Sequence, residues 1–427
     1  FCRFSAILSG EKTRRETPVH KGDSCMKSVV LLCDGMADTP CPELGGRTPM
    51  EAARKPAMDA LAAVSEIGLV RTVPDGMAPG SDVANLTMMG YDTRACYTGR
   101  SPLEAANIGI DLADDDVAFR CNLVTLSDDP VFADKTILDY CAGDIHTREA
   151  DELVRAVQEA FGGGDFDFYT GTAYRHCMVW HGGQTELGAV TPPHDITGRV
   201  IGGYLPRHPD AAPLLDMMER SYALLSDHPI NRARVAKGLP AANAIWLWGQ
   251  GKRPRLQNFR ERFGLEGAMI SAVDLLKGIG RLAGMEVCDV PGATGYIDTN
   301  FYGKAVAAAK ELKDGQDFVY IHIEAPDECG HRGEVETKVR SIEMIDQFVL
   351  KPLLNELEDY DDYRILVLPD HPTPLYTRTH SGDPVPFLLY QKTHPCLGVP
   401  EFSEEQARKT GVFVAQGHTL IERLILR

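Results

Sequence analysis

The feature that most constrains this chain is a set of three short apolar runs, each followed closely by acidic or imidazole side chains. The runs are Val29–Cys33, Phe318–Ile323 and Ile365–Leu368. A short apolar run bounded by Pro, Gly or charged residues predicts a buried strand. In open α/β sheets, functional groups collect just beyond the carboxyl ends of the strands. The side chains that follow these runs are therefore expected at one edge of a sheet.

Stretches of helical character separate the apolar runs. We expect strands near residues 28–33, 318–323, 364–368 and 386–390, and helices over stretches such as 303–312 and 335–354. Strands separated by helices predict a largely parallel sheet with helices on both faces. The expected fold class is therefore α/β.

The side chains after the apolar runs, together with one serine, form a set that suits two divalent cations. They are Asp34, Ser81, Asp327, His331, Asp370, His371 and His380. Ser81 belongs to the set because Met77–Gly80 predicts a turn that opens into the first turns of a helix. Carboxylate oxygen and neutral imidazole nitrogen suit Mn²⁺, Zn²⁺ or Mg²⁺, and a set without Cys differs from most closed structural zinc sites.

Charge counting favours a metal-activated serine nucleophile. The three aspartates and a deprotonated Ser81 supply four negative charges, which balance two divalent cations. Taken singly, each residue is more simply a turn, cap or hydrogen-bonded residue. A capping box at Ser81 is incomplete, because Ala84 rather than Glu or Gln stands three residues later. The joint placement of these residues is what favours a catalytic site.

Five motifs carry a resemblance to a known family. They are Asp34-Gly35 after the first run, Pro79-Gly-Ser-Asp-Val-Ala-Asn85, Glu324-Ala-Pro-Asp-x-x-Gly-His331, Leu368-Pro-Asp-His-Pro-Thr-Pro374 and Arg378-Thr-His-x-x-Asp-Pro-Val-Pro-Phe387. In this order they resemble the cofactor-independent phosphoglycerate mutases of the archaeal type, a branch of the alkaline phosphatase superfamily. The resemblance runs from about Met26 to the end of the chain. It implies an alkaline-phosphatase-like three-layer sandwich with a mostly parallel sheet, plus an inserted α+β domain.

The resemblance also implies roles for the predicted ligand residues. Ser81 would be the nucleophile that becomes phosphoserine. One cation would be held by Asp34, Ser81, Asp370 and His371, and the other by Asp327, His331 and His380. The cofactors would be two divalent metal ions, with Mn²⁺ preferred and Mg²⁺, Co²⁺ or Zn²⁺ as alternatives. The reaction would interconvert 3-phosphoglycerate and 2-phosphoglycerate in glycolysis and gluconeogenesis without 2,3-bisphosphoglycerate.

Other functions stay open at this point. A homoserine kinase-like phosphotransferase of the same family would require ATP, and a metal-dependent phosphomonoesterase would release phosphate to water. A non-catalytic scaffold would have no reason to keep the whole ligand set together. No G-x-x-x-x-G-K-[ST] motif supports a P-loop ATP site. The glycine-rich stretch Gly278–Gly284 lacks a clear preceding strand, which favours helix packing over a dinucleotide loop.

The order of the motifs predicts an inserted domain. Asp34 and Ser81 come early and the other ligand residues come late, so the intervening chain must leave the sheet and return. We expect a discontinuous metal-binding catalytic domain over 26–100 and 250–427, and a substrate-binding or transferase domain over 101–249. Residues 1–25 are expected to be an N-terminal extension, either disordered or the product of an overlong start before Met26.

An anionic substrate needs cations, which we expect mainly in the insertion. The candidates, most of which end or flank apolar segments, are Arg175, His176, His194, Asp195, Lys252, Arg253 and Lys277, with weaker ones at Arg100, His146 and Lys304. Arg offers a planar fork for carboxylate or phosphate. The alternative is that any of them is a solvated surface charge.

Composition excludes several partner classes. The formal net charge of −17 argues against nucleic acid or anionic membrane as a partner, and no apolar run approaches the length of a membrane span, about 18 residues. The 11 cysteines are an odd number scattered without C-x-x-C spacing, which predicts free thiols in a reducing cytoplasm. The expected partner is a small phosphorylated molecule, and the sequence does not determine the oligomeric state.

Overall fold

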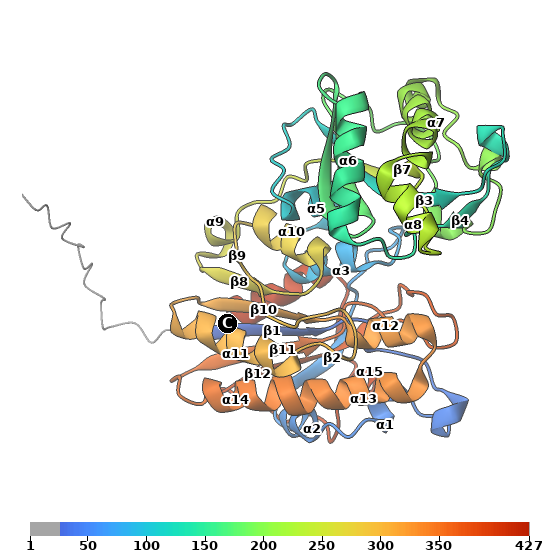
Figure 1. The fold of residues 1–427 in the computed structure, drawn as a ribbon. Helices are drawn as coiled ribbons and strands as arrows, with labels where there is room; N and C mark the ends of the chain where they lie inside the picture. Colours follow the sequence, from blue (N-terminus) through green and yellow to red (C-terminus); the bar gives the residue numbers. More distant parts are fainter. Residues whose placement is uncertain (1–25, 427) are drawn as a thin grey trace, which may run out of the picture.

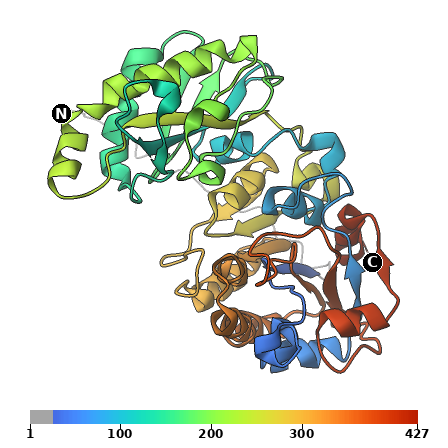
Figure 2. The same cartoon turned by 90° about the vertical axis from the view of Figure 1, so that its right-hand side faces the viewer.

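The computed structural model describes residues 26–426, which form two sheets joined by a pair of chain crossings (Figure 1; Figure 2). The first sheet has eight strands and the second has five. Figure 2 shows each sheet at the centre of its own lobe. Residues 1–25, predicted to be an extension, lie outside the described residues.

The first sheet is mostly parallel, with the strand order β13-β2-β12-β11-β1-β10-β8-β9. Its strands are β1 (Lys27–Cys33), β2 (Glu66–Val70), β8 (Gly267–Ile270), β9 (Glu286–Cys288), β10 (Phe318–Ile323), β11 (Tyr363–Leu368), β12 (Val385–Gln391) and β13 (Phe413–Val414). Among these, only β12 runs against the others, because it pairs antiparallel with both β11 and β2. The predicted fold class is confirmed, and the four strands expected from the apolar runs lie where they were predicted.

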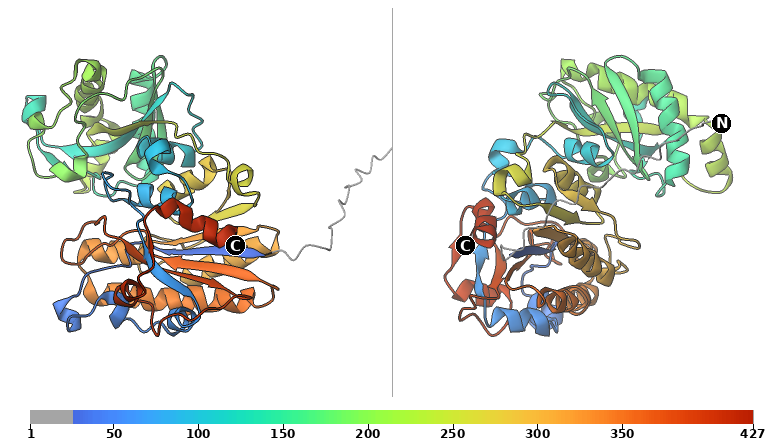
Figure 3. Two further views of the ribbon diagram at one scale, coloured as in Figure 1. Left: turned by 180° about the vertical axis from the view of Figure 1, so that it is seen from behind. Right: turned by 90° about the vertical axis from the view of Figure 1, so that its left-hand side faces the viewer.

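Helices cover both faces of the first sheet and give three layers (Figure 3). The helices of this lobe are α1 (Pro49–Ala52), α2 (Pro56–Ala62), α3 (Ser81–Met88), α4 (Thr93–Cys96), α9 (Phe259–Phe263), α10 (Asp274–Leu282), α11 (Phe301–Lys313), α12 (Ala325–Arg332), α13 (Val335–Ile345), α14 (Lys351–Leu357), α15 (Glu404–Lys409) and α16 (Leu420–Ile425). α5 (Ser101–Asn107) lies between the two sheets and packs on α10. A π-helical turn, Asp346–Leu350, joins α13 to α14 and makes one long stretch where a helix was expected. Within residues 26–426, none of the helices combines the length and the apolar character needed to cross a bilayer.

Alternation along the strands explains the three layers. Successive side chains of a strand point to opposite faces of its sheet. Val29 and Leu31 of β1 pack into a core with α11, α13 and α14, whereas Val30 and Leu32 pack into a core with α3, α10 and α16. Both faces of the central strands are apolar, as a parallel sheet buried on both sides requires.

The second sheet is antiparallel and has its own core. Its strands are β3 (Val117–Leu126), β4 (Ile137–Asp139), β5 (Phe166–Thr172), β6 (Arg175–Trp180) and β7 (Ala244–Lys252), and its helices are α6 (Thr147–Phe161), α7 (Ala212–Ser226) and α8 (Pro229–Ala236). Phe119, Leu153 and Trp246 lie in one buried cluster that is separate from the two cores of the first sheet. The predicted α+β insertion is confirmed as an architecture, and its division from the rest at residues 101 and 249 stays a prediction.

The two chain crossings run side by side. Ser101 Oγ donates to the Gly249 carbonyl, and a Cβ added at Gly99 would lie 2.5 Å from the Gln250 carbonyl oxygen. Gly99 also has a φ of 134°, a conformation that favours glycine. The backbone of the outgoing chain therefore touches the backbone of the returning chain.

The glycine-rich stretch at Gly278 is a helix-packing site, as predicted. Gly278 lies in α10, and a Cβ added there would meet the Leu103 carbonyl oxygen of α5 at 1.7 Å. Only a residue without a side chain permits this approach. α5 and α10 thus pack backbone to backbone beside the crossings.

Candidate active site

The edge at which β1, β10 and β11 end carries most of the predicted ligand residues. Because these three strands are parallel neighbours, their carboxyl ends meet. Asp34 directly follows β1, and Asp370 and His371 come just after β11. α12 starts just after β10 and places Asp327 and His331 one helical turn apart on the same face. Residues far apart in the sequence thus gather at one edge.

Ser81 is the first residue of α3, and its hydroxyl lies against this edge. Ser81 Oγ is 3.2 Å from His371 Nε2 and 3.4 Å from Asp34 Oδ2. His371 Nε2 is in turn 3.4 Å from Asp370 Oδ2 and 3.6 Å from Asp34 Oδ1. Asp34, Asp370 and His371 are all buried. The serine hydroxyl therefore faces a cluster of acidic and imidazole groups sheltered from bulk water.

A second group lies beside the first. His331 Nε2 and His380 Nε2 are 2.9 Å apart, and each is 3.3 Å from a different oxygen of Asp327. The His380 ring stacks on that of His371 with their centres 3.9 Å apart. Thr373 Oγ1 donates a hydrogen bond to Asp327 Oδ1 and holds this carboxylate from the other side. The stacked rings of His371 and His380 therefore place the two ligand groups directly beside each other.

The donor atoms of these side chains fit divalent cations. They converge in two sets of ligand atoms lying within 4.8 Å of one another, namely Asp34 with Asp370 and His371, and Asp327 with His371 and His380. Asp34 Oδ1 is buried and has no hydrogen-bond partner among residues 26–426. His331 Nε2 and His380 Nε2 face each other, so a proton can occupy only one of the two nitrogens comfortably. Oxygen and nitrogen donors aimed at common points are what Mn²⁺, Zn²⁺ or Mg²⁺ requires, and the cation displaces any proton that they carry when it binds.

Electrostatics at this edge also favour a bound cation. Burial and the nearby Asp370 raise the pKa of Asp34 well above its usual range. Burial lowers the pKa of His371, so its imidazole is neutral at neutral pH. The hydrogen bond to Asp327 raises the pKa of His331 to about 9. Burial opposes the ionisation of Asp327, but the hydrogen bonds that Asp327 accepts from His331 and His380 hold the pKa of Asp327 well below the usual range. The crowded carboxylates repel one another in the absence of positive charge.

Two residues that support the site, His322 and Asn85, were not predicted as site residues from the sequence. His322, inside β10, has its Nε2 2.8 Å from Asp34 Oδ2, and burial lowers the pKa of His322 to about 3. Asn85 Nδ2 donates to Asp370 Oδ2 at 3.0 Å. For His322 the available signal was a polar side chain inside an otherwise apolar strand, since a buried polar group needs a partner.

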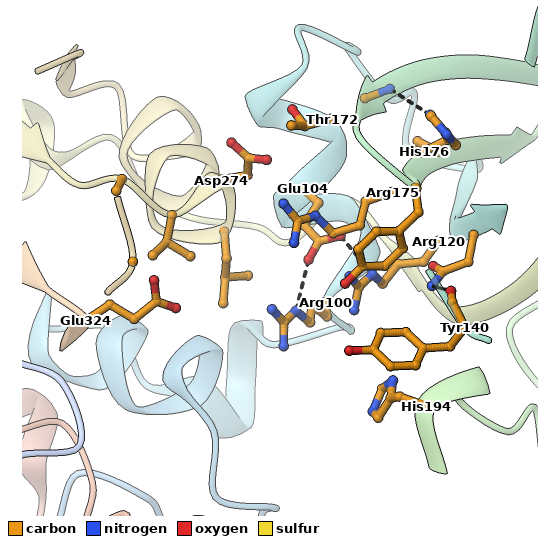
Figure 4. Close-up of a pocket in the computed structure, with 18 of the residues that line it drawn as sticks. Arg100, Glu104, Arg120, Tyr140, Thr172, Arg175, His176, His194, Asp274 and Glu324 are labelled. Carbon is orange, nitrogen blue, oxygen red and sulfur yellow. Dashed lines mark hydrogen bonds and ion pairs between the residues drawn. The ribbon is translucent and has the colours of Figure 1, made fainter. Parts of the chain in front are cut away.

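A cavity of about 730 Å³ opens between the two sheets and reaches the second ligand group (Figure 4). His331 and Glu328 lie on its first-sheet side, and residues of α5, β3 and β6 line the other side. Burial raises the pKa of Glu324, on the first-sheet wall, to about 8, which lowers the negative charge that this wall presents. The cavity thus connects the ligand-bearing edge with the second sheet.

Three arginines gather on the second-sheet side of this cavity. Arg100 and Arg120 each contact a different oxygen of Glu104 at 2.9 Å, and Arg175 lies beside them in Figure 4. Arg120 is 8% exposed, and its guanidinium lies over the Trp248 ring at 4.3 Å from the ring centre. Three guanidinium groups with one carboxylate leave this wall positively charged, which suits an anionic ligand.

The structure brings some of the predicted substrate residues into the cavity and leaves others outside it. Arg175, His176 and His194 line it, whereas Asp195, Lys252, Arg253 and Lys277 do not. Arg253 instead pairs with Asp111 at 2.7 Å, and Lys277 pairs with Asp289 at 2.5 Å. His176 is buried, and burial lowers its pKa to about 3, so it contributes no positive charge at neutral pH.

Of the three weaker substrate-binding candidates, one lines the cavity and two do not. Arg100 lines the cavity, His146 caps the start of α6, and Lys304 is buried and donates to the His322 carbonyl at 3.0 Å. Arg120 was not predicted, although an arginine inside the otherwise apolar β3 was a visible signal.

The chain is similar along most of its length to known phosphoglycerate mutases. Residues 62–231 match the family model described as 2,3-bisphosphoglycerate-independent phosphoglycerate mutase. The probable 2,3-bisphosphoglycerate-independent phosphoglycerate mutase of Geobacter sulfurreducens is 52% identical over 403 residues, which cover 94% of this chain and 100% of the relative. The 2,3-bisphosphoglycerate-independent phosphoglycerate mutase of Methanothrix thermoacetophila is 51% identical over 401 residues, with the same coverage of 94% and 100%.

Two solved structures also resemble the chain. The PH0037 protein from Pyrococcus horikoshii superposes with a TM-score of 0.75 at 30% identity, covering 93% of this chain and 97% of that one. The cofactor-independent phosphoglycerate mutase from Thermoplasma acidophilum gives a TM-score of 0.63 at 28% identity, covering 94% and 99%. The likeness includes both sheets, since nearly the whole of each chain is matched.

Proposed function

Because this chain belongs to the family of 2,3-bisphosphoglycerate-independent phosphoglycerate mutases, we propose that it interconverts 3-phosphoglycerate and 2-phosphoglycerate through a phosphoserine at Ser81. The reaction depends on two divalent cations in this proposal and serves glycolysis and gluconeogenesis. Mn²⁺ is the proposed ion, with Mg²⁺, Co²⁺ or Zn²⁺ as alternatives. The nine cysteines of the described residues are free thiols, which fits a reducing cytoplasm.

One observation carries the proposal: the Ser81 hydroxyl contacts the first ligand group, and the second ligand group beside it reaches the cavity. Ser81 Oγ contacts His371 and Asp34, and His331 of the adjoining group lines the cavity. Asp34, Ser81, Asp370 and His371 would hold one cation, and Asp327, His331 and His380 the other. When bound, such ions lower the pKa of a coordinated hydroxyl and neutralise the oxygens of a phosphoryl group. The helix start at Ser81 adds backbone N–H groups directed toward the same place.

The chain's own residues divide the remaining work. Ser81 Oγ accepts the phosphoryl group, and the arginines of the second sheet hold the glycerate by its carboxylate while its hydroxyl groups exchange places. Arg100, Arg120 and Arg175 suit this role because a guanidinium binds a carboxylate through two parallel hydrogen bonds. Trp248 under Arg120 keeps that guanidinium in place. A mutase must retain the dephosphorylated intermediate, and this wall provides the means.

The arginines that line the cavity bear on the choice between the mutase and the phosphomonoesterase. A phosphomonoesterase has no need to hold the alcohol after transfer, so a cationic wall on the cavity that reaches the second ligand group favours the mutase. A homoserine kinase-like enzyme would bind ATP and a substrate that carries an amino group. Homoserine carries a carboxylate beside that amino group, and the arginines suit this carboxylate as well, so the assay with ATP decides between the mutase and the kinase.

The test is an assay of purified protein with 3-phosphoglycerate and Mn²⁺, without bisphosphoglycerate or ATP. We expect 2-phosphoglycerate to form, EDTA to stop its formation and added Mn²⁺ to restore it. A parallel assay with homoserine and ATP tests the kinase alternative, and release of inorganic phosphate tests the phosphomonoesterase. Absence of 2-phosphoglycerate alongside either of the other products would replace the proposed reaction.

Substitution of the nucleophile tests the mechanism. Ser81→Ala should abolish turnover while leaving the protein folded, because the phosphoryl group has no acceptor. Ser65→Ala is the matched control, since Ser65 is a buried serine whose hydroxyl donates to the Leu61 carbonyl at 2.6 Å, at the opposite end of β2 from the ligand-bearing edge. Full turnover by Ser81→Ala would contradict the phosphoserine mechanism.

A further inference from the structure

Strand β10 presents two polar side chains on one face, directly beneath the ligand-bearing edge. Tyr320 and His322 are two residues apart, so they point to the same face. Both are 0% exposed. The opposite face of β10 carries Val319, Ile321 and Ile323, which pack in an apolar core. A buried strand needs no polar group for packing, and each polar group here must be satisfied by a partner.

His322 connects Ser271 to Asp34. Ser271 Oγ accepts a hydrogen bond from the Val273 N–H at 3.0 Å, so its own hydroxyl proton is free to be donated to His322 Nδ1, 3.1 Å away. A carboxylate only accepts, so His322 Nε2 carries the proton that is donated to Asp34 Oδ2 at 2.8 Å. Asp34 is thereby fixed through Oδ2. Its other oxygen, Oδ1, has no partner among residues 26–426 and remains available.

Tyr320 connects Asn85 to Asp370 in a similar way. The Tyr320 hydroxyl donates to Asn85 Oδ1 at 2.7 Å, which identifies the oxygen side of the Asn85 amide. The amide nitrogen then donates to Asp370 Oδ2 at 3.0 Å and to the Ser81 carbonyl at 2.8 Å. This one amide ties the first turn of α3 to the end of β11. Tyr320 therefore fixes Asp370 relative to Ser81.

We propose that Tyr320 and His322 are positioning residues that orient Asp370 and Asp34 for the cation held beside Ser81. The proposal rests on the proposed function, because it needs the cation. Neither side chain has a hydrogen bond to Asp327, His331 or His380, whose described partners are instead one another, Thr373 and the Arg378 and Pro79 carbonyls. The effect is therefore confined to one of the two ligand groups. Partners of this kind around a metal site typically change metal affinity by about 10- to 100-fold.

The test measures Mn²⁺ binding to the metal-free full-length protein, by calorimetry and by the electron paramagnetic resonance signal of free Mn²⁺. Tyr320→Phe removes only the hydroxyl, and His322→Leu removes the donor to Asp34. We expect each to weaken one of two Mn²⁺ sites by about 10- to 100-fold and to leave the other unchanged. His322→Gln, whose amide nitrogen can take the place of Nε2, should recover most of the loss.

The matched control is Tyr91→Phe. Tyr91 is also a buried tyrosine, and its hydroxyl donates to the Gln257 carbonyl at 2.7 Å away from the ligand groups. We expect wild-type Mn²⁺ binding from this variant. If His322→Leu does not fold, Ser271→Ala replaces it, because this change keeps the imidazole but frees its ring; a weaker loss at the same single site is then expected.

Two results would overturn the proposal: wild-type affinity at both sites in Tyr320→Phe and His322→Leu, or an equal loss at both sites, which would indicate a general effect on the fold. Failure of the proposed function looks different. A wild-type protein that binds two Mn²⁺ ions but does not convert 3-phosphoglycerate would refute the mutase and keep the positioning role. A wild-type protein that binds no Mn²⁺ would refute both.

Discussion

Replacing His176 should flatten the dependence of stability on pH. His176 lies in β6 with Nδ1 accepting the Gly171 N–H at 3.2 Å, and its Nε2 is buried without a hydrogen-bond partner among residues 26–426. Burial lowers its folded-state pKa to about 3, whereas an unfolded histidine has a pKa of about 6.5. Between these values the unfolded state binds one proton more than the folded state, so stability falls as the pH drops below about 6.5.

The size of this effect follows from the two pKa values. The linkage relation gives a loss of about 2 kcal/mol for this one residue between pH 7 and pH 5. His176→Asn keeps an acceptor for the Gly171 N–H and removes the titrating group. Between pH 7 and pH 5 the free energy of unfolding of this variant should therefore fall by about 2 kcal/mol less than that of the wild-type protein. Urea unfolding at both pH values measures this, with EDTA present so that cation binding does not contribute.

The matched control is His394→Asn, which removes an exposed histidine. This variant should lose as much stability between pH 7 and pH 5 as the wild-type protein does. Equal losses in His176→Asn and the wild-type protein would refute the reasoning and would mean that His176 is charged in the folded state. In that case His176 would count as a cation in the cavity after all.

Three further predictions concern packing, a buried charge and cation binding. Gly278→Ala should destabilise the protein by about 1–3 kcal/mol or more in urea unfolding, since its Cβ would meet the Leu103 carbonyl. The control Gly164→Ala, with open space around it, should change little, and equal effects of the two variants would contradict the packing of α5 on α10. Lys338→Met should lower the free energy of unfolding, measured in urea, by about 3–5 kcal/mol, because it leaves the buried Asp38 carboxylate without its ion-pair partner. The double variant with Asp38→Asn should recover much of that loss, and no recovery would show that the ion pair is not what stabilises this region. Saturating Mn²⁺ should raise the melting temperature of the metal-free protein. A ligand that binds only the folded state stabilises it by about 2.7 kcal/mol when its concentration is 100 times its Kd. An unchanged melting temperature would contradict cation binding.

Local sequence was enough to predict the edge of the first sheet. Asp34, Asp370 and His371 directly follow apolar runs, so the strand ends alone predict the edge at which these residues lie. Ser81 is similar, because the turn before it and the helix after it are both local. The helix packing of Gly278 could also be predicted, since no strand precedes it.

Pairings between distant residues could not be predicted. His322 and Asp34 are 288 residues apart, and the two strands come together only through the topology of the sheet. Arg120 faces the cavity because β3 presents that side of its pleat, and the register of β3 against β6 and β7 is set by the second core. Lys252 and Arg253 were chosen because they flank an apolar segment, but the direction of β7 takes them to the end away from the cavity wall.

The central position of β1 has a consequence for the order in which the protein can be assembled on the ribosome. β1 pairs with β10 on one side and β11 on the other, as in Val29 beside Val319 and Ile365. It is synthesised first, yet both neighbours are synthesised after the entire second sheet. All strands of that second sheet lie between Val117 and Lys252, which are themselves paired. The second sheet can therefore form before either neighbour of β1 has been synthesised. Asp34 therefore meets its partners from β10 and β11 only in the last stage of translation.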